Sequence, residues 1–332
     1  MIMSFQEAIR VQKPVSRPVP WLWPGRIAAG RLTLIDGDPD QGKSFVTLDL
    51  AARLTAGHTL PDGCRPSGPM AVLLLSAEDT REDTIVPRLL AAGADLGRVH
   101  FWDEALLGVP VFPEACMQLQ QVLETTQARL VVIDPFFAFL GQEIGSLNDF
   151  MIRRALQPLA RVAELSQAAI VLIRHLSKVG VTKQAIYRGL GSIAILGMAR
   201  TAFLVGADPD DGERRIFACT KNNLAASTPS LGFRIVPTDA DMARIEWLGA
   251  AERTADDLVE AGRKRGQAVP RAVAFLREQL AHGPCDRETL LSHAEAIGLS
   301  FRTLERAKSQ LGVLSQQRRE GGRSVWYWRL GD

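Results

Sequence analysis

The chain has 332 residues, 46% of them hydrophobic, so it can bury one large core and a small second one, and a single small domain is excluded. Its 39 basic and 37 acidic side chains give a formal net charge of +2, so any basic surface must be local. The four cysteines are scattered without a CxxC pair, which argues against a zinc site or a disulfide framework. No segment reaches the roughly 18 apolar residues of a membrane span. We therefore expect a cytoplasmic protein with reduced thiols and no membrane partner.

Short apolar runs alternate with amphipathic stretches through the first half of the chain, after a proline-rich lead-in at 1–30. The apolar runs predict strands at Leu32–Ile35, Val72–Leu75, Val99–Trp102, Leu130–Ile133 and Ile170–Ile173. The stretches between them predict helices at Lys43–Ala56, Arg81–Ala94, Pro113–Thr126 and Asn148–Ser166. Strands and helices in alternation indicate an α/β fold with a mostly parallel sheet and crossover helices.

After residue 200 the pattern changes to strands without helices between them. These strands are predicted at Thr201–Val205, Arg215–Thr220, Gly232–Val236 and Ala243–Trp247. The turn Asp208–Gly212 makes the first two a hairpin. An antiparallel extension of the sheet therefore closes a first domain over 31–249. The polar stretch 250–267 is typical of a linker or a solvated helix.

The last part of the chain, 268–332, predicts a small winged helix-turn-helix domain. The predicted elements are a helix from Pro270 to His282, a helix capped by Asp286, a helix capped by Ser300 that ends at Leu311, and strands at Leu314–Arg318 and Ser324–Arg329. The turn Glu320–Arg323 joins the two strands. Three helices followed by a hairpin are the element order of that fold.

The stretch GDPDQGKS, Gly37–Ser44, follows a predicted strand and opens a predicted helix, with the spacing G-x-x-x-x-G-K-[ST] of a phosphate-binding loop. Lys43 would bridge the β- and γ-phosphates, and Ser44 would ligate Mg²⁺. The alternative is a glycine-rich turn without a ligand. Two aspartates occupy variable positions, where side chains can point away from the phosphates. The predicted nucleotide-binding residues are Gly37, Asp38, Pro39, Asp40, Gln41, Gly42, Lys43, Ser44 and Phe45.

Two carboxylates at strand ends are candidates for the hydrolytic chemistry. Asp134 ends an apolar strand and is expected to hold Mg²⁺ together with Ser44, although it could be an ordinary strand-end aspartate. Because Pro135 occupies the place of the glutamate that many NTPases carry there, the base must come from elsewhere. Glu78 ends a strand that we expect beside the phosphate-loop strand, and we predict it as the base that activates water. The alternative is that Glu78 and Asp79 merely cap the next helix.

A histidine ends one further predicted strand. His175 is expected to contact the γ-phosphate and to couple its loss to the following loop, unless it is only structural. Three basic residues of that loop are candidates for DNA phosphates or are simply solvated, namely Lys178, Lys183 and Arg188.

The motifs GDPDQGKS, LLLSAED, LVVIDP and LIRH, in this order over about Pro20–Gly249, resemble the RecA-like AAA-domain ATPases of the plasmid RepA-type hexameric replicative helicases. The resemblance implies a homo-hexamer or other ring in which a neighbouring subunit supplies a positive charge to the γ-phosphate. Arg200 stands where that pattern has its arginine finger, and Lys221 where related proteins have an interface lysine. The alternative for both residues is that they are ordinary surface charges. Asp40 replaces a more usual glycine.

Adenine is the expected base, because the chain lacks a guanine-reading NKxD motif, and ATP with Mg²⁺ is the expected ligand. Trp21 and Trp23 could border the base, but aromatic residues in a proline-rich segment are more typical of packing anchors.

Residues 265–332 carry 11 basic and 7 acidic side chains, a net charge of +4, so the local basic region is the small domain. Its third helix has Phe301, Leu304, Ala307 and Leu311 at core spacing, which turns Arg302, Arg306 and Ser309 to the opposite face. That face would enter a duplex major groove. The arginines expected on flanking phosphates are Arg318, Arg319 and Arg323. The alternative is a protein contact or a solvated face.

These features predict an ATP-hydrolysing motor on DNA, a helicase or translocase of a plasmid, phage or mobile element. Single-stranded DNA would lie on the ATPase loops and duplex DNA on the winged helix. A second interpretation is an ATP-dependent DNA-binding switch, in which the winged helix gives specificity and hydrolysis resets assembly. A small-molecule kinase is disfavoured by the C-terminal domain and by the position of Glu78.

Overall fold

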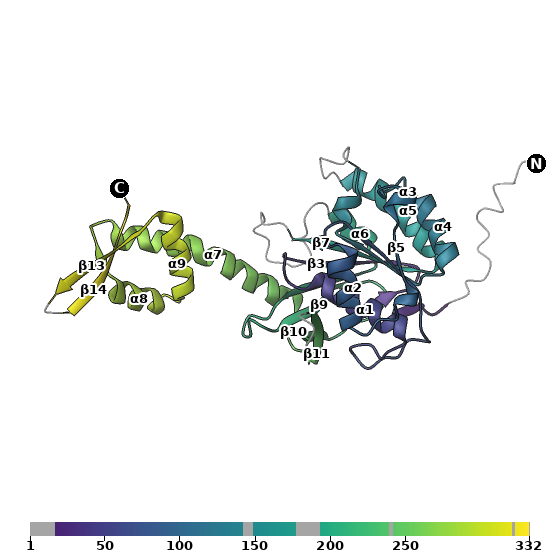
Figure 1. The fold of residues 1–332 in the computed structure, drawn as a ribbon, viewed down its shortest axis with the longest axis horizontal. Helices are drawn as coiled ribbons and strands as arrows, with labels where there is room; N and C mark the ends of the chain where they lie inside the picture. The colour runs from purple at the N-terminus through teal and green to yellow at the C-terminus, as the bar shows by residue number, and fades with distance from the viewer. Residues whose placement is uncertain (1–16, 142–148, 177–192, 239–241, 321–322, 332) are drawn as a thin grey trace, which may run out of the picture. The chain divides into compact units, whose positions relative to one another are not determined.

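The computed structural model describes residues 17–141, 149–176, 193–238, 242–320 and 323–331. The chain divides into two compact units, Met1–Asp256 and Asp257–Asp332 (Figure 1). In the described residues, no helix is long and apolar enough to cross a membrane. All four cysteines are free thiols in the structure.

The first unit is built on a large sheet. Its strands are β3 (Leu32–Gly37), β4 (Val72–Ser76), β5 (Val99–Phe101), β6 (Leu130–Asp134), β7 (Ala169–His175), β8 (Thr201–Ala207), β9 (Arg215–Asn222), β10 (Ser230–Pro237) and β11 (Ala243–Ala251). The nine strands lie in the order β11-β10-β9-β8-β3-β7-β6-β4-β5. Neighbouring strands are parallel along the stretch β8-β3-β7-β6-β4-β5. Strands β9, β10 and β11 are antiparallel to their neighbours. The predicted mostly parallel sheet with an antiparallel extension is therefore confirmed.

Helices cover both faces of this sheet (Figure 1). They are α1 (Lys43–Ala56), α2 (Val86–Ala91), α3 (Glu104–Leu107), α4 (Cys116–Thr126), α5 (Asp149–Ser166) and α6 (Ile193–Met198), with a π-helical turn η1 (Arg81–Ile85) and 3-10 turns η2 (Leu96–Arg98) and η3 (Phe136–Phe139). Alternate residues of β4 belong to different cores: Leu73 and Leu75 pack with α4 and α5, whereas Val72 and Leu74 pack with α1 and α2. Because both faces are covered, the strands are continuous apolar runs.

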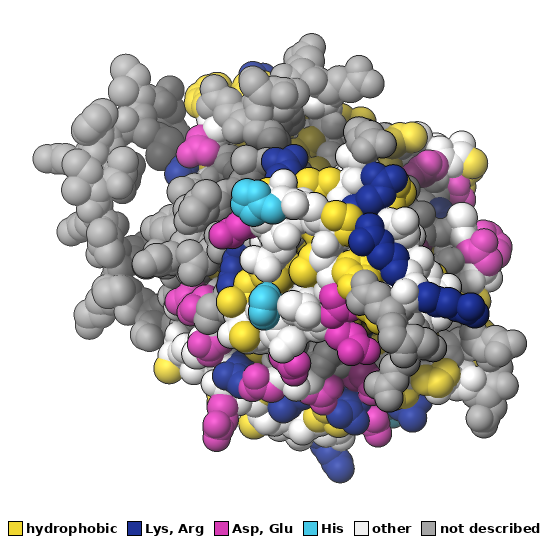
Figure 2. All heavy atoms as spheres, turned by 90° about the vertical axis from the view of Figure 1, so that its left-hand side faces the viewer, with side chains coloured by type: hydrophobic (Ala, Val, Ile, Leu, Met, Phe, Trp, Pro, Cys, Tyr) yellow, Lys and Arg dark blue, Asp and Glu magenta, His cyan; other side chains and the backbone are white. Residues whose placement is uncertain are grey.

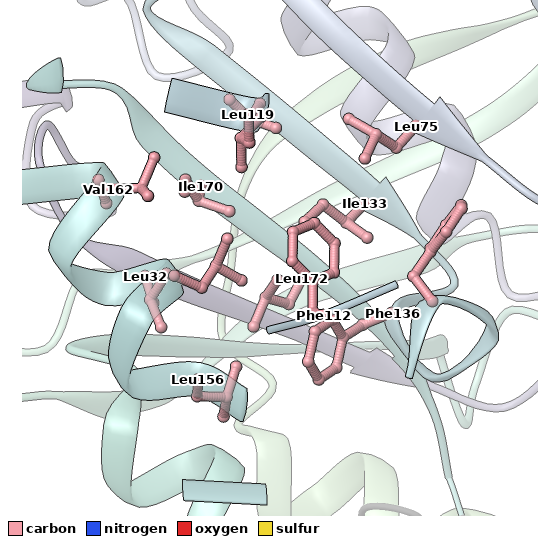
Figure 3. Packing of buried hydrophobic residues seen from close by; sticks show 14 of the residues in the cluster. Leu32, Leu75, Phe112, Leu119, Ile133, Phe136, Leu156, Val162, Ile170 and Leu172 are labelled. Atoms are coloured by element: carbon pink, nitrogen blue, oxygen red, sulfur yellow. The ribbon is translucent and has the colours of Figure 1, made fainter. Parts of the chain in front are cut away.

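The core on the α4 and α5 side reaches the end of β6. Figure 3 shows Phe112 and Phe136 beside Ile133 and Leu172, and the two phenylalanine rings lie 6.5 Å apart. Phe136 is fully buried and follows Asp134 by two residues. The carboxylate at the end of β6 is therefore held next to a packed core.

A short antiparallel pair, β1 (Trp21–Trp23) and β2 (Ile27–Ala28), precedes the large sheet. Trp23 is fully buried, stacks on Phe217 at 5.8 Å and donates a hydrogen bond from Nε1 to Asp62. This tryptophan is thus a packing anchor, and the alternative that it borders a nucleotide base is wrong.

The second unit consists of helices and a small sheet. Its elements are α7 (Ala255–Leu280), β12 (Cys285–Asp286), α8 (Arg287–Ala296), α9 (Phe301–Leu311), β13 (Leu314–Glu320) and β14 (Arg323–Arg329), and the sheet has the order β12-β14-β13. Asp286 accepts a hydrogen bond from the amide of Thr289 and Ser300 from that of Thr303, so both predicted N-caps are confirmed. Leu276, Leu290, Leu304 and Trp328 form the core.

Two details of this unit differ from the sequence-based expectations. Pro270 does not open a helix but lies inside α7, which already begins at Ala255 and takes up most of the stretch expected as a linker or solvated helix. A proline inside a helix removes a single backbone hydrogen bond, and buried Ala272 and Leu276 hold the helix beyond it. Phe301 is 48% exposed instead of buried, because it is the first residue of α9, and Arg287 lies over its ring.

Candidate active site

The phosphate loop connects β3 to α1, as predicted. Gly37 needs to be glycine, because a Cβ there would lie 2.5 Å from the carbonyl oxygen of Val205. Gly42 precedes α1 with φ of 91°. Asp40 is exposed and has φ of 62°, in the left-handed region that favours glycine but that aspartate tolerates better than most residues. The backbone of the loop therefore accommodates the departure from glycine at this position.

Lys43 is buried at the start of α1 and points back into the loop. Its Nζ donates hydrogen bonds to the carbonyl oxygens of Gly37, at 3.0 Å, and Asp38, at 2.8 Å. It also lies 3.2 Å from Nδ1 of His175. Burial lowers the pKa of Lys43, and the nearby carboxylates, Asp134 first among them, oppose this shift. The ammonium group is thus held where phosphate oxygens could replace the carbonyls.

Ser44, the next residue, hydrogen-bonds through its side chain to Asp134 at the end of β6. Burial raises the pKa of Asp134, while the Ser44 hydrogen bond and the charge of Lys43 act in the opposite direction. A hydroxyl and a carboxylate are hard oxygen ligands of the kind that Mg²⁺ prefers. This donor pair fits a magnesium ion that is held jointly with phosphate oxygens.

His175 comes into the site because its strand pairs with the phosphate-loop strand. In the parallel register of β3 and β7, His175 lies opposite Gly37. Its Nε2 is 3.8 Å from Oε2 of Glu78, whose side chain is 65% exposed. His175 therefore stands between Lys43 and Glu78, with one ring nitrogen toward each.

The expected position of Glu78 needs a correction. Its strand, β4, is not a neighbour of β3, because β7 and β6 lie between them. Glu78 reaches the site from the loop that follows β4. The alternative role as a helix cap is also wrong, because Thr80 is the residue that precedes the helical turn η1.

Lys43, Ser44, Glu78 and His175 border one cavity of about 300 Å³. It is lined by Pro39, Asp40, Gly42, Lys43, Ser44, Phe45, Glu78, Asp79, Arg88, His175 and Ile235. Arg88 and Ile235 were missed by the sequence reasoning. The guanidinium of Arg88 lies 4.5 Å from the ring centroid of Phe45 and 2.9 Å from a carboxylate oxygen of Asp79. No sequence signal distinguishes Arg88 or Ile235, since they belong to α2 and to the antiparallel extension.

Arg200 and Lys221 lie away from the phosphate loop of their own chain. The amide of Arg200 donates to the carbonyl of Leu32, the first residue of β3, whereas the phosphate loop follows the last residue of that strand. Arg200 is exposed and lines a separate cavity of about 450 Å³ together with Arg31 and Arg161.

Lys221 is engaged with the end of α6. Its Nζ donates to the carbonyl oxygens of Leu196, at 2.5 Å, and Ala199, at 2.8 Å. Burial lowers the pKa of Lys221, and the charge of Arg200 lowers it further. Lys221 therefore satisfies carbonyl groups at the turn that presents Arg200.

The candidate DNA-binding residues fall into three groups. Lys178, Lys183 and Arg188 lie outside the described residues. Arg302, Arg306 and Ser309 are exposed on α9, opposite buried Leu304 and Ala307. Of the hairpin arginines, Arg318 and Arg319 are exposed, and the side chain of Arg323 lies outside the described part. On the face that Figure 2 shows, Lys and Arg side chains lie in a short row, and acidic side chains gather below it.

Comparison with known proteins identifies the first unit. A family model described as an AAA domain matches residues 3–181, which is more than half of the chain. A search of curated proteins finds no match. The matched segment contains the phosphate loop, Glu78, Asp134 and His175. The chain therefore belongs to the AAA domain family, and its α/β unit is that of a P-loop ATPase.

Proposed function

We propose that this protein is an ATP-hydrolysing RecA-like motor that acts on DNA, a RepA-type replicative helicase or translocase of a plasmid, phage or mobile element. One observation carries the proposal. Lys43, Ser44, Glu78 and His175, from three separate segments of the chain, border one cavity, and Asp134, from a fourth segment, hydrogen-bonds to Ser44 behind it. The cavity lies at the carboxyl ends of the parallel strands, where ligands bind in open α/β folds.

Each residue has a role that its contacts support. Lys43 exchanges the carbonyls of Gly37 and Asp38 for the β- and γ-phosphate oxygens of ATP. Ser44 and Asp134 would hold Mg²⁺, and the ion would neutralise phosphate charge. Glu78, exposed toward solvent, takes a proton from the attacking water. His175 lies between the ammonium of Lys43 and the carboxylate of Glu78. Loss of the γ-phosphate therefore changes the charges that act on the His175 ring.

Arg200 acts on the nucleotide of a neighbouring subunit. Its backbone lies at the amino end of β3, whereas the nucleotide of its own chain would lie beyond the carboxyl end. A homo-hexamer or other ring would bring the two together, because the amino ends of the strands in one subunit then face the carboxyl ends of the strands in the next. Lys221, which binds the carbonyls at the end of α6, orders the turn that carries Arg200.

The second unit is proposed to be a winged helix domain that binds duplex DNA. Its support is the element order, three helices with a terminal hairpin, and the exposed arginines of α9 and β13. Single-stranded DNA is expected on the loops of the first unit, where Lys178, Lys183 and Arg188 occur in the sequence.

A test that separates a motor from a switch is the ATPase rate of the full chain. Single-stranded DNA should stimulate hydrolysis several-fold, and sizing with a nonhydrolysable ATP analogue should show a ring. Binding only to duplex DNA, with no stimulation of hydrolysis, would instead favour the ATP-dependent DNA-binding switch, whose specificity would come from α9. The matched control is Lys43→Ala, which should be inactive with and without DNA.

A further inference from the structure

The hairpin of the second unit carries an exposed tryptophan. Trp326 is 45% exposed on β14, and no aromatic or cationic side chain in the described part of the chain contacts its ring. The other aromatic residues of the strand differ in this respect: Trp328 is buried under Lys308, and Tyr327 lies beneath Arg318. Single exposed apolar side chains are common on protein surfaces, so the residues beside this ring decide whether it can serve a ligand.

The strand register defines what surrounds this ring. Trp326 pairs with Gln317, and the pair next along the hairpin on the same face is Arg319 with Ser324. Trp328 is also on this face, two residues from Trp326, and its burial shows that the helices cover the inner half of the face. The outer half is left with the aromatic ring of Trp326, the guanidinium of Arg319 and two uncharged polar side chains, those of Gln317 and Ser324.

The charge and polarity of this surface favour nucleic acid over protein. The sixteen residues Leu314–Arg329 contain four arginines and one glutamate. The fully buried centre of a protein interface is more apolar than its rim, whereas the neighbours of Trp326 on its face are glutamine, serine and arginine. A flat ring with a cation beside it matches a base and its phosphate, since stacking on an aromatic ring does not depend on which base is present.

We infer that the outer half of this hairpin face is a stacking site for an unpaired DNA base, with Trp326 as the platform and Arg319 on the adjoining phosphate. This inference rests on the proposed function, action on DNA, and assigns a specific part of the DNA to the hairpin. A base can offer its face to a side chain only where it is not stacked in a duplex, so the site engages a single strand or its junction with a duplex. The exposed arginines of α9 remain available to the duplex on the other side of the junction.

The test uses the full chain and three fluorescein-labelled oligonucleotides: a blunt duplex, a duplex with a single-stranded tail, and a single strand. Trp326→Ala should weaken binding to the tailed duplex about 10-fold and to the blunt duplex less than about 2-fold. Trp326→Phe, which keeps an aromatic plane, should retain most of the affinity. Leu314→Ala is the matched control, because Leu314 is 47% exposed on the opposite face of the same hairpin. Unchanged melting temperatures show that the variants are folded.

A second measurement locates the base directly. With 5-iodouracil in the single-stranded tail, irradiation should crosslink the DNA to Trp326, and moving the iodouracil into the duplex should abolish that crosslink. Crosslinks that avoid Trp326, or an equal loss of affinity for blunt and tailed duplex, would overturn the stacking site while leaving the proposed function intact. A chain that binds none of the three oligonucleotides would overturn the proposed function itself.

Discussion

Arg174 and Asp36 form a bidentate ion pair between β7 and β3, with Nε 2.6 Å from Oδ1 and Nη2 2.7 Å from Oδ2. Both side chains are buried. The pair lies one residue before His175 on one strand and one residue before Gly37 on the other. It therefore fixes the register that brings His175 to the phosphate loop.

Removing one member of this pair should destabilise the protein more than removing both. Asp36→Ala leaves the buried Arg174 guanidinium without its carboxylate, and the expected loss is about 3–5 kcal/mol in the free energy of unfolding. Asp36→Leu combined with Arg174→Met removes both charges and should lose less. Urea unfolding of the two variants measures the difference; a double variant as unstable as the single one would contradict this account.

Glu78→Gln should separate hydrolysis from binding. The amide cannot take a proton from water, so the turnover number should fall roughly 100- to 10,000-fold. Nucleotide affinity should change little, because the side chain of Glu78 is 65% exposed and comes from the loop after β4, not from the phosphate loop. Steady-state ATPase assays and fluorescent-nucleotide titration measure the two quantities. The matched control is Glu82→Gln, a nearby exposed carboxylate on η1 that should keep its activity.

Mixing two inactive variants should restore activity if Arg200 acts on a neighbour. Arg200→Ala keeps its own phosphate loop, and Lys43→Ala keeps its arginine, so a mixed assembly contains some complete interfaces. Alone, Arg200→Ala should lower the ATPase rate about 1,000-fold or more. Lys43→Ala alone should lower it roughly 100- to 1,000-fold. Arg161→Ala, in the same cavity as Arg200 but paired with Glu164, is the control. Absence of complementation would place the catalytic charge elsewhere.

Asp134→Asn should stabilise the protein without ligands at neutral pH. The pKa of Asp134 is raised in the folded state, so its ionisation costs stability as the pH rises from the unfolded pKa through the folded one. The free energy of unfolding of the variant should exceed that of the wild type at pH 7, and the difference should disappear at a pH below the unfolded pKa of about 4.

Magnesium with ATP should reverse the order of stability of the wild type and Asp134→Asn. In the proposed site the Asp134 carboxylate holds the ion together with Ser44, so MgATP should raise the melting temperature of the wild type more than that of Asp134→Asn. ATP with EDTA is the reference condition. An equal response of both proteins to MgATP would remove Asp134 from the magnesium site.

Much of the fold could be predicted from the sequence because short stretches of residues determine most of its strands, its helices and the phosphate loop. The strands of the parallel sheet are covered by helices on both faces, so each is a continuous apolar run. The phosphate loop is local as well, since its glycines, Lys43 and Ser44 are consecutive or nearly so.

The rest depends on contacts between distant segments. Chain order does not give strand order, and Glu78 was therefore expected next to β3 although two strands intervene. Arg88 and Ile235 line the cavity, but the segments that carry them contain no motif that marks a binding site. Phe301 satisfies the helical spacing of a core residue, but α9 begins there and its first residue is left exposed.

The strands after residue 200 have a practical consequence for any attempt to isolate the catalytic part. The segment that matches the AAA family ends at residue 181, yet β10 provides Ile235 as a wall of the nucleotide cavity and β8 is hydrogen-bonded to β3. A fragment cut at that point would expose the unpaired edge of β3 and the ring of Trp23, which stacks on Phe217 in the full chain. The smallest piece able to bind nucleotide should therefore extend through Ala251, the end of β11.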